Sequence, residues 1–183
     1  DYEHDYAHEH EENEEDIVAM TSYEVVRRAI EFDGPDRLPI RFDQMGVTDV
    51  RSVCWNQIGT GDRAERRALD EWGCLWERSE MENMGQVKGH PLADWSALDS
   101  FTWPDPDNPA LYQGMELYLD EADDLYCQSG IFMLLFERMH ALRGFENTLV
   151  DLCAEPERIG LLADRIVDYD LGIMRNIHDR FPT

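Results

Sequence analysis

Two side chains of opposite charge stand at the end of a short predicted strand. The strand covers residues 38–42, and Arg41 and Asp43 lie at its carboxyl end. A carboxylate can act as a general base, and a guanidinium group can anchor an acidic group of a substrate. We therefore take Asp43 and Arg41 as candidate catalytic residues. The alternative interpretation is a surface ion pair or a loop cap.

Candidate substrate-binding residues follow a second predicted strand, residues 125–129. Gln128 and Ser129 are the last two residues of this strand. They carry an amide and a hydroxyl that can form hydrogen bonds with a ligand. They could equally satisfy backbone groups at the strand end. Trp76 is a third candidate, because several tryptophans could together line a pocket for a flat ligand, although core packing is the common role of tryptophan. The tryptophans considered with it are Trp72, Trp95 and Trp103.

Other acidic residues, histidines and cysteines are better explained without a catalytic or metal-binding role. Asp70 and Glu71 are adjacent on a predicted helix and so point in different directions, which favours solvated charges over a catalytic carboxylate pair. His4 and His8 have the i, i+4 spacing of metal ligands, but they lie in an acidic segment where incidental solvated histidines are the better interpretation. The cysteines form no CxxC pair, so we expect reduced thiols and predict no metal site; they are Cys54, Cys74, Cys127 and Cys153.

The charge of the chain excludes some partners. Its 183 residues include 40 acids and 16 bases, a formal net charge of −24. Nucleic acids and anionic membranes are polyanions, so we expect neither as a partner. Lys88 is the only lysine. Few lysines and many acids suggest a surface kept soluble in high salt; the alternative is a genome that favours arginine codons.

The first residues look unlike the rest. Nine of the acids fall within residues 1–16, and we treat residues 1–19 as a flexible acidic tail outside the fold. This segment lacks the basic and apolar regions of a signal peptide, and no apolar run reaches about 18 residues. We therefore expect a cytoplasmic protein without a transmembrane helix.

The remaining residues, 20–183, predict one helix-rich α/β domain. Apolar spacing and capping residues predict helices separated by a few short strands, an alternation that favours parallel pairing. Three or four strands correspond to half of a (β/α)8 barrel, which typically needs about 250 residues. The predicted helices cover residues 22–33, 49–58, 62–72, 94–98, 109–123, 131–143, 145–153 and 156–179; the strands cover 38–42, 74–77, 86–88 and 125–129.

Four segments, in this order, resemble the uroporphyrinogen decarboxylase superfamily. They are Pro-Asp-Arg-Leu-Pro at 35–39, Asp-Glu-Trp-Gly-Cys at 70–74 with Trp76, His-Pro-Leu at 90–92 leading to Trp-Pro-Asp-Pro at 103–106, and Phe-Glu-Arg-Met at 136–139 with Leu-Arg-Gly-Phe-Glu-Asn at 142–147. The resemblance runs from about residue 22 to residue 181. It implies the N-terminal half of a (β/α)8 barrel, with a small-molecule substrate bound at the carboxyl ends of the strands.

The resemblance is compatible with two branches of the family, and the residues favour one of them. True decarboxylases grip substrate carboxylates with several arginines, whereas the matching region here, residues 38–46, offers only Arg41. We therefore expect a methyltransferase-like member that acts on a corrinoid or thiol acceptor, with porphyrinogen decarboxylation as the alternative. A corrinoid and zinc belong to the full-length family members, and we assign no cofactor to this chain.

A third hypothesis concerns the part of the barrel that this chain represents. Half a barrel exposes sheet edges and apolar helix faces that need a cover. The chain would then be a non-catalytic half-barrel that self-associates. We accordingly expect a homodimer, or pairing with the missing C-terminal half.

Overall fold

The computed structural model describes residues 19–53, 55, 66–78, 85–120 and 124–181. These residues form two compact units. Unit 1 comprises the described residues up to Arg51 together with Asp124–Tyr126, and unit 2 comprises the described residues from Ser52 onward except Asp124–Tyr126. Residues 1–18 of the predicted acidic tail, which include His4 and His8, lie outside the described residues, as do Cys54 and residues 56–65.

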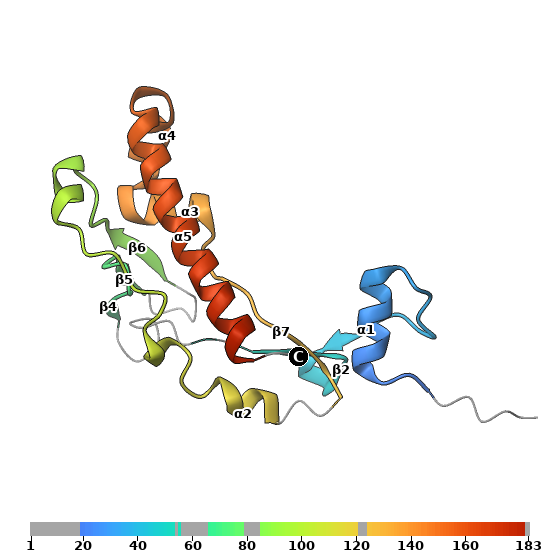
Figure 1. Ribbon diagram of the computed structural model, residues 1–183. Coiled ribbons are helices and arrows are strands. Elements are labelled where there is room, and N and C mark those ends of the chain that lie inside the picture. Colours follow the sequence, from blue (N-terminus) through green and yellow to red (C-terminus); the bar gives the residue numbers. More distant parts are fainter. Residues whose placement is uncertain (1–18, 54, 56–65, 79–84, 121–123, 182–183) are drawn as a thin grey trace, which may run out of the picture. The chain divides into compact units, whose positions relative to one another are not determined.

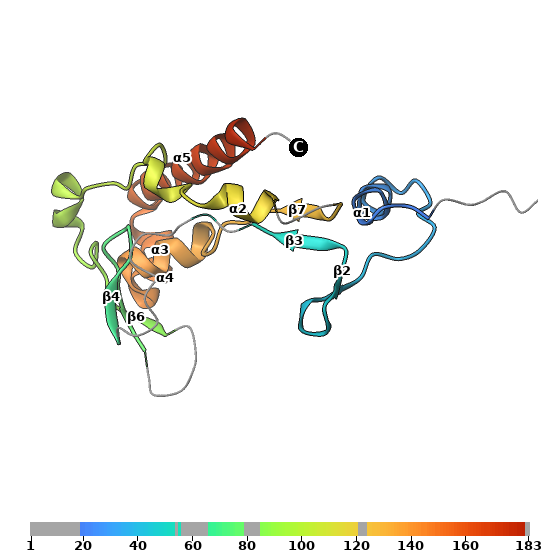
Figure 2. The ribbon, with the colours of Figure 1, turned by 90° about the horizontal axis from the view of Figure 1, so that it is seen from below.

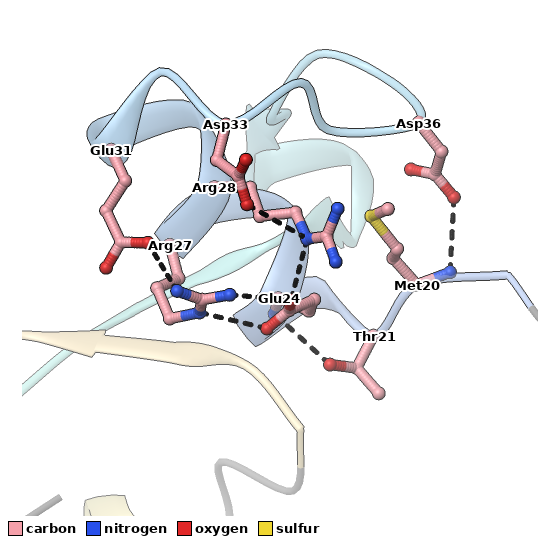
Figure 3. Close-up of polar contacts among 8 residues, drawn as sticks. All are labelled: Met20, Thr21, Glu24, Arg27, Arg28, Glu31, Asp33 and Asp36. Carbon is pink, nitrogen blue, oxygen red and sulfur yellow. Dashed lines mark hydrogen bonds and ion pairs between the residues drawn. The ribbon is translucent and has the colours of Figure 1, made fainter.

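Unit 1 begins with helix α1, Ser22–Glu31, which confirms the first predicted helix. The Thr21 hydroxyl accepts a hydrogen bond from the Glu24 backbone N–H at 3.2 Å, as expected for a Ser/Thr N-cap. The Glu24 carboxylate accepts hydrogen bonds from Arg27 and Arg28 on the same helix (Figure 3). These two arginines lower the pKa of Glu24 to about 2.

A buried carboxylate organises the rest of unit 1. Asp49 is 3% exposed and accepts hydrogen bonds from the Ser22 hydroxyl, the Ile40 backbone N–H and both terminal nitrogens of Arg37. These donors, Arg37 first, hold the pKa of Asp49 well below its usual range. The single carboxylate thus links the start of α1 to the segment that leads into the following hairpin.

Three short elements form that hairpin. A second segment of unit 1, Asp124–Tyr126, follows much later in the sequence. Strands β1 and β2 pair antiparallel, with Phe42 opposite Val47. Asp124–Tyr126, distant in sequence, complete unit 1: the Tyr23 N–H donates to the Asp124 carbonyl at 2.7 Å, and the rings of Tyr23 and Tyr126 stack with centroids 5.7 Å apart. The hairpin elements are β1 (Arg41–Phe42), η1 (Asp43–Met45) and β2 (Val47–Thr48).

Strands β3, Val50–Ser52, and β7, Tyr126–Gln128, form a two-stranded sheet (Figures 1 and 2). The Tyr126 N–H donates to the Asp49 carbonyl, and the Val53 N–H donates to the Gln128 carbonyl. Both segments advance in the same direction between these two bonds, so the pairing is parallel. This pair meets the expectation of parallel strands.

Unit 2 contains an antiparallel sheet, whereas mostly parallel strands were expected. Its strands are β4 (Arg67–Leu69), β5 (Leu75–Glu77) and β6 (Gln86–Gly89), in the order β4-β5-β6. The five residues between β4 and β5 are too few for a parallel crossover, which needs a dozen or more, so these strands can only form a hairpin.

The other regular elements of unit 2, apart from its share of β3 and β7, are helices. The Asp94 and Asn108 side chains cap two of them, because they accept hydrogen bonds from the Ser96 and Ala110 N–H groups. Helices α3, α4 and α5 pack on one another (Figure 1, orange to red). The elements are η2 (Trp95–Ser100), η3 (Pro109–Leu111), α2 (Met115–Asp120), α3 (Leu135–Arg143), α4 (Phe145–Ala154) and α5 (Pro156–Arg180). Within the described residues, none of the helices combines the length and apolar character needed to cross a membrane.

One buried arginine connects α3 and α4 to the loop before η2. Arg143 is 4% exposed; it donates to the Asp151 carboxylate and to the carbonyls of Leu92 and Ala93. Its guanidinium lies 4.1 Å from the Trp95 ring. All charge on this side chain is therefore compensated inside the protein, as a buried charge requires.

Two predicted helices are wrong where the structure describes them. The helix expected at 49–58 begins as strand β3, and the helix expected at 62–72 contains strand β4 followed by a turn at Glu71–Trp72. Short apolar patterns fit a helix and a strand alike, and β-branched Val50 and Val53 favour a strand. Both segments become strands because β3 pairs with β7 and β4 pairs with β5.

Candidate functional site

The carboxyl ends of the parallel strands lie beside each other. After β7 the chain continues through Ser129 and Gly130, and the Trp55 indole N–H donates to the Gly130 carbonyl at 3.1 Å. The Val53 N–H donates to the Gln128 carbonyl at 2.8 Å. These two bonds fix the peptide groups of 128–130 next to the end of β3.

A pocket of about 300 Å³ opens at this edge, entirely within unit 2. One wall consists of residues 127–131, with Val53 beside them. The facing wall comes from the last turns of α5 and from Met115 at the start of α2. The α5 and C-terminal residues in this wall are Met174, Ile177, His178 and Phe181.

The lining is apolar on one side and polar on the other. Met115, Met174 and Ile177 offer aliphatic carbon and thioether sulfur, whereas Gln128 and Ser129 offer an amide and a hydroxyl. Among the described residues that line it, none is Lys or Arg. The arrangement suits a small ligand with an apolar body and a hydrogen-bonding head.

One imidazole and one thiol also reach the pocket. The His178 Nδ1 lies 3.2 Å from the Asp179 carboxylate, and both side chains are exposed. Histidine can hold or release a proton near neutral pH. Cys127 is half-buried and lines the pocket beside Gln128.

The predicted site residues therefore fall in three places. Gln128 and Ser129 line the pocket together. Arg41 and Asp43 belong to unit 1, where they form an exposed ion pair with 3.0 Å between Nε and Oδ2. Trp76 is 9% exposed in the core of unit 2, and its indole N–H donates to the Asp70 carboxylate at 3.0 Å.

Asp70 was expected to be solvated, and this interpretation is wrong. Asp70 is 6% exposed, and its carboxylate accepts from the backbone N–H groups of Trp72 and Cys74, from Trp76 and from Arg138 at 2.7 Å. The two backbone bonds make the Asp-Glu-Trp-Gly-Cys segment a side-chain-capped turn between β4 and β5. An Asp followed three residues later by a Gly is a turn signal that the helix interpretation overlooked.

Glu71 is buried as well, contrary to expectation, but it lacks such partners. Its side chain is 7% exposed, and neither carboxylate oxygen makes a hydrogen bond. The nearest cation is Arg138, whose Nη2 lies 3.9 Å from Glu71 while its Nη1 donates a hydrogen bond to Asp70. Burial raises the pKa of Glu71 to about 7.

The surroundings of Glu71 add two further perturbed groups on α5. Burial raises the pKa of Asp170 to about 6 and also raises the pKa of Tyr169. The Tyr169 hydroxyl is buried without a hydrogen-bond partner. The Tyr169 ring meets the Trp72 ring edge-on, with centroids 4.8 Å apart. Within the described residues, no three His, Cys, Asp or Glu side chains are grouped to hold a metal ion.

No family model, curated protein or solved structure matches this chain.

Proposed function

We propose that unit 2 contributes the substrate pocket of a (β/α)8-barrel enzyme of the uroporphyrinogen decarboxylase superfamily, in its methyltransferase-like branch. One observation carries the proposal: a pocket lies at the carboxyl edge of the parallel β3–β7 pair, with Gln128 and Ser129 in its wall. In α/β barrels and sheets, ligands bind at this edge. On this proposal β3 and β7 are neighbouring barrel strands.

The size and charge of the pocket favour a small substrate over a porphyrinogen. At about 300 Å³ it lies at the lower end of the range for small-molecule sites. A tetrapyrrole with several carboxylates needs several cations, and the described lining contains no Lys or Arg. The net charge of −24 would also repel such a substrate.

The side chains in the pocket have distinct roles on this proposal. Gln128 and Ser129 bind the polar head of the substrate, and Met115 and Met174 contact its methyl-bearing part. His178 can accept or deliver the proton of a thiol or hydroxyl at the pocket edge. Asp43 and Arg41, which pair with each other in unit 1, have no assigned role in this pocket.

The groups that the resemblance implies in full-length members do not fit these residues. The pocket is too small for a corrin ring, and its lining offers one imidazole and one thiol where zinc takes at least three protein ligands. The described lining therefore fits neither a corrinoid nor zinc.

Methyl-labelled methionine provides a direct test of the pocket. In an NMR titration with 2-(methylthio)ethanol, the Met115 and Met174 methyl signals should shift and saturate, while that of Met139, in the core, should stay in place. Ser129→Ala should weaken binding about fivefold to tenfold, because it removes one hydrogen bond. Ser100→Ala, on the exposed end of η2, should bind like the wild type.

Two results would contradict the proposal. If uroporphyrin shifts the Met115 and Met174 signals at lower concentration than the methylthio compound, the decarboxylase branch is correct. If neither compound gives a saturable shift, the pocket is not a binding site.

A further inference from the structure

Helix α4 exposes its apolar side chains and buries polar ones. Phe145, Leu149 and Leu152 recur at i, i+4 and i+7, so they form one stripe, and they are 56%, 45% and 46% exposed. The residues that α4 buries are Thr148 and Asp151. A surface helix of a monomeric globular protein has the opposite arrangement: it buries its apolar side chains and exposes its polar ones.

Side chains of α3 adjoin the stripe. The ring of Phe136 meets that of Phe145 edge-on at 6.4 Å, and the His140 ring contacts both, with ring centroids 5.6 and 5.9 Å away. We define the α3–α4 apolar face by side chains that are each between 37% and 56% exposed. They are Phe132, Leu134, Leu135, Phe136, Phe145, Leu149 and Leu152.

The size of this face matches half of a homodimer interface. A fully buried aromatic side chain contributes about 150–250 Å². Four of the seven side chains are leucines, so the lower figure applies, and seven half-exposed side chains then present roughly 500 Å² of apolar surface. A standard interface buries about 800 Å² on each partner, of which about 65% is apolar in homodimers. The face is thus as large as a second copy requires, and large for an exposed patch on a monomer.

The charge of the chain selects among partners. A net charge of −24 disfavours nucleic acid and anionic lipid on any face. Within α4 the only charged residue besides the buried Asp151, which pairs with Arg143, is Glu146. Two copies therefore meet with least repulsion where both present this charge-poor stripe.

We propose that the α3–α4 apolar face is a contact surface for a second copy of this chain. A helix stripe of this spacing is self-complementary, so α4 of one copy packs against α4 of the other about a twofold axis near Leu149. The proposal is independent of the ligand pocket, because none of the seven residues lines it. Salt strengthens the dimer, since it screens the repulsion between two anionic chains.

Sedimentation velocity of the full chain tests this surface with a matched pair of variants. Leu149→Glu places a charge in the stripe, and Val150→Glu places the same charge on the next residue, 63% exposed and about 100° around the helix. We expect the wild type and Val150→Glu to sediment at twice the 21.4 kDa chain mass at micromolar concentration in about 1 M salt. Leu149→Glu should weaken the dimer at least tenfold, with an unchanged far-UV circular dichroism spectrum.

Three outcomes would overturn the proposal. A wild type that stays monomeric in this salt range means that another molecule or segment covers the face. Equal dissociation of both variants means that the dimer forms elsewhere. A dimer that salt dissociates means that the contact is between charges.

Discussion

Asp70 and Glu71 are sequence neighbours in the same buried turn, yet they meet opposite electrostatic conditions. Asp70 has four hydrogen-bond donors, including Arg138. Glu71 has none, and its closest cation is committed to Asp70. A buried carboxylate without donors takes up a proton instead of remaining charged. The turn therefore places a carboxylate with four donors beside a carboxylate that has none and whose pKa burial raises to about 7.

The titration of Glu71 predicts how stability depends on pH. Its folded pKa of about 7 lies above the ordinary value of 4.5, so the folded state binds more protons between these values. Stability should therefore fall as pH rises from about 4.5 to about 7, by on the order of 3 kcal/mol for this group. Glu71→Gln should flatten this part of the profile, measured by urea unfolding at several pH values.

Asp170 accounts for the pH dependence of stability that should remain in the Glu71→Gln variant. Its pKa is raised to about 6, so it also releases a proton within this window, and Glu71→Gln should leave that smaller dependence in place. A profile for Glu71→Gln that is as steep as the wild type would show that Glu71 is ionised throughout.

The Asp70–Arg138 pair predicts a large loss of stability at a single residue. Arg138→Ala leaves a buried carboxylate without its charged partner and should cost about 3–5 kcal/mol. Arg158→Ala is the control, because its ion pair with Glu155 is half exposed and should be worth at most about 1 kcal/mol. Urea unfolding of both variants measures the difference, and similar losses would contradict a structural role for the pair.

At the scale of elements, many boundaries were predictable because their signals are local. The Thr21 cap, the Asn108–Pro109 start and Pro156 at the first turn of α5 each depend on a few neighbouring residues. Strands β3 and β4 were not predictable, because their partners β7 and β5 decide them. The role of Asp70 depends on Arg138, 68 residues away, and no local pattern carries that information.

Two glycines on α5 give a prediction for this helix. A Cβ at Gly172 would meet Pro106 Cβ and Cγ at 2.7 Å, whereas a Cβ at Gly160 would meet nothing within 4 Å. Gly160→Ala should therefore stabilise the protein by about 0.5–1 kcal/mol through helix propensity. Gly172→Ala should destabilise it by about 1–3 kcal/mol, because the proline ring cannot yield. Thermal unfolding of both variants checks the opposite signs; equal gains would show that Pro106 moves aside.

At the scale of the whole molecule, the described structure has mixed helix and strand content in two units, while the charge is a property of the entire chain. The parallel β3–β7 pair and the pocket at its end agree with the expected α/β character, and the half-barrel remains a proposal. Gln128 and Ser129 could be selected from the sequence because they end a strand. The α5 wall of the pocket could not, since nothing local indicates which helix faces that edge.

The net charge predicts a response to salt. Screening reduces the repulsion among the acids, so the melting temperature should rise between low salt and about 1 M KCl. Near the isoelectric point of about 4.3 the net charge vanishes, so the increment should shrink there. A melting temperature that does not rise at neutral pH would contradict a surface adapted to high salt.

The discontinuity of unit 1 has a consequence for synthesis on the ribosome. Helix α1 and Asp49 are translated first, but the residues that complete their unit, Asp124–Tyr126, are translated more than seventy residues later. Until then the nascent chain carries an unfinished first unit, and closing so long a loop is slow. Unit 1 therefore matures only once nearly all of the intervening chain has been made, so β7 sets the order in which the nascent protein acquires its folded parts.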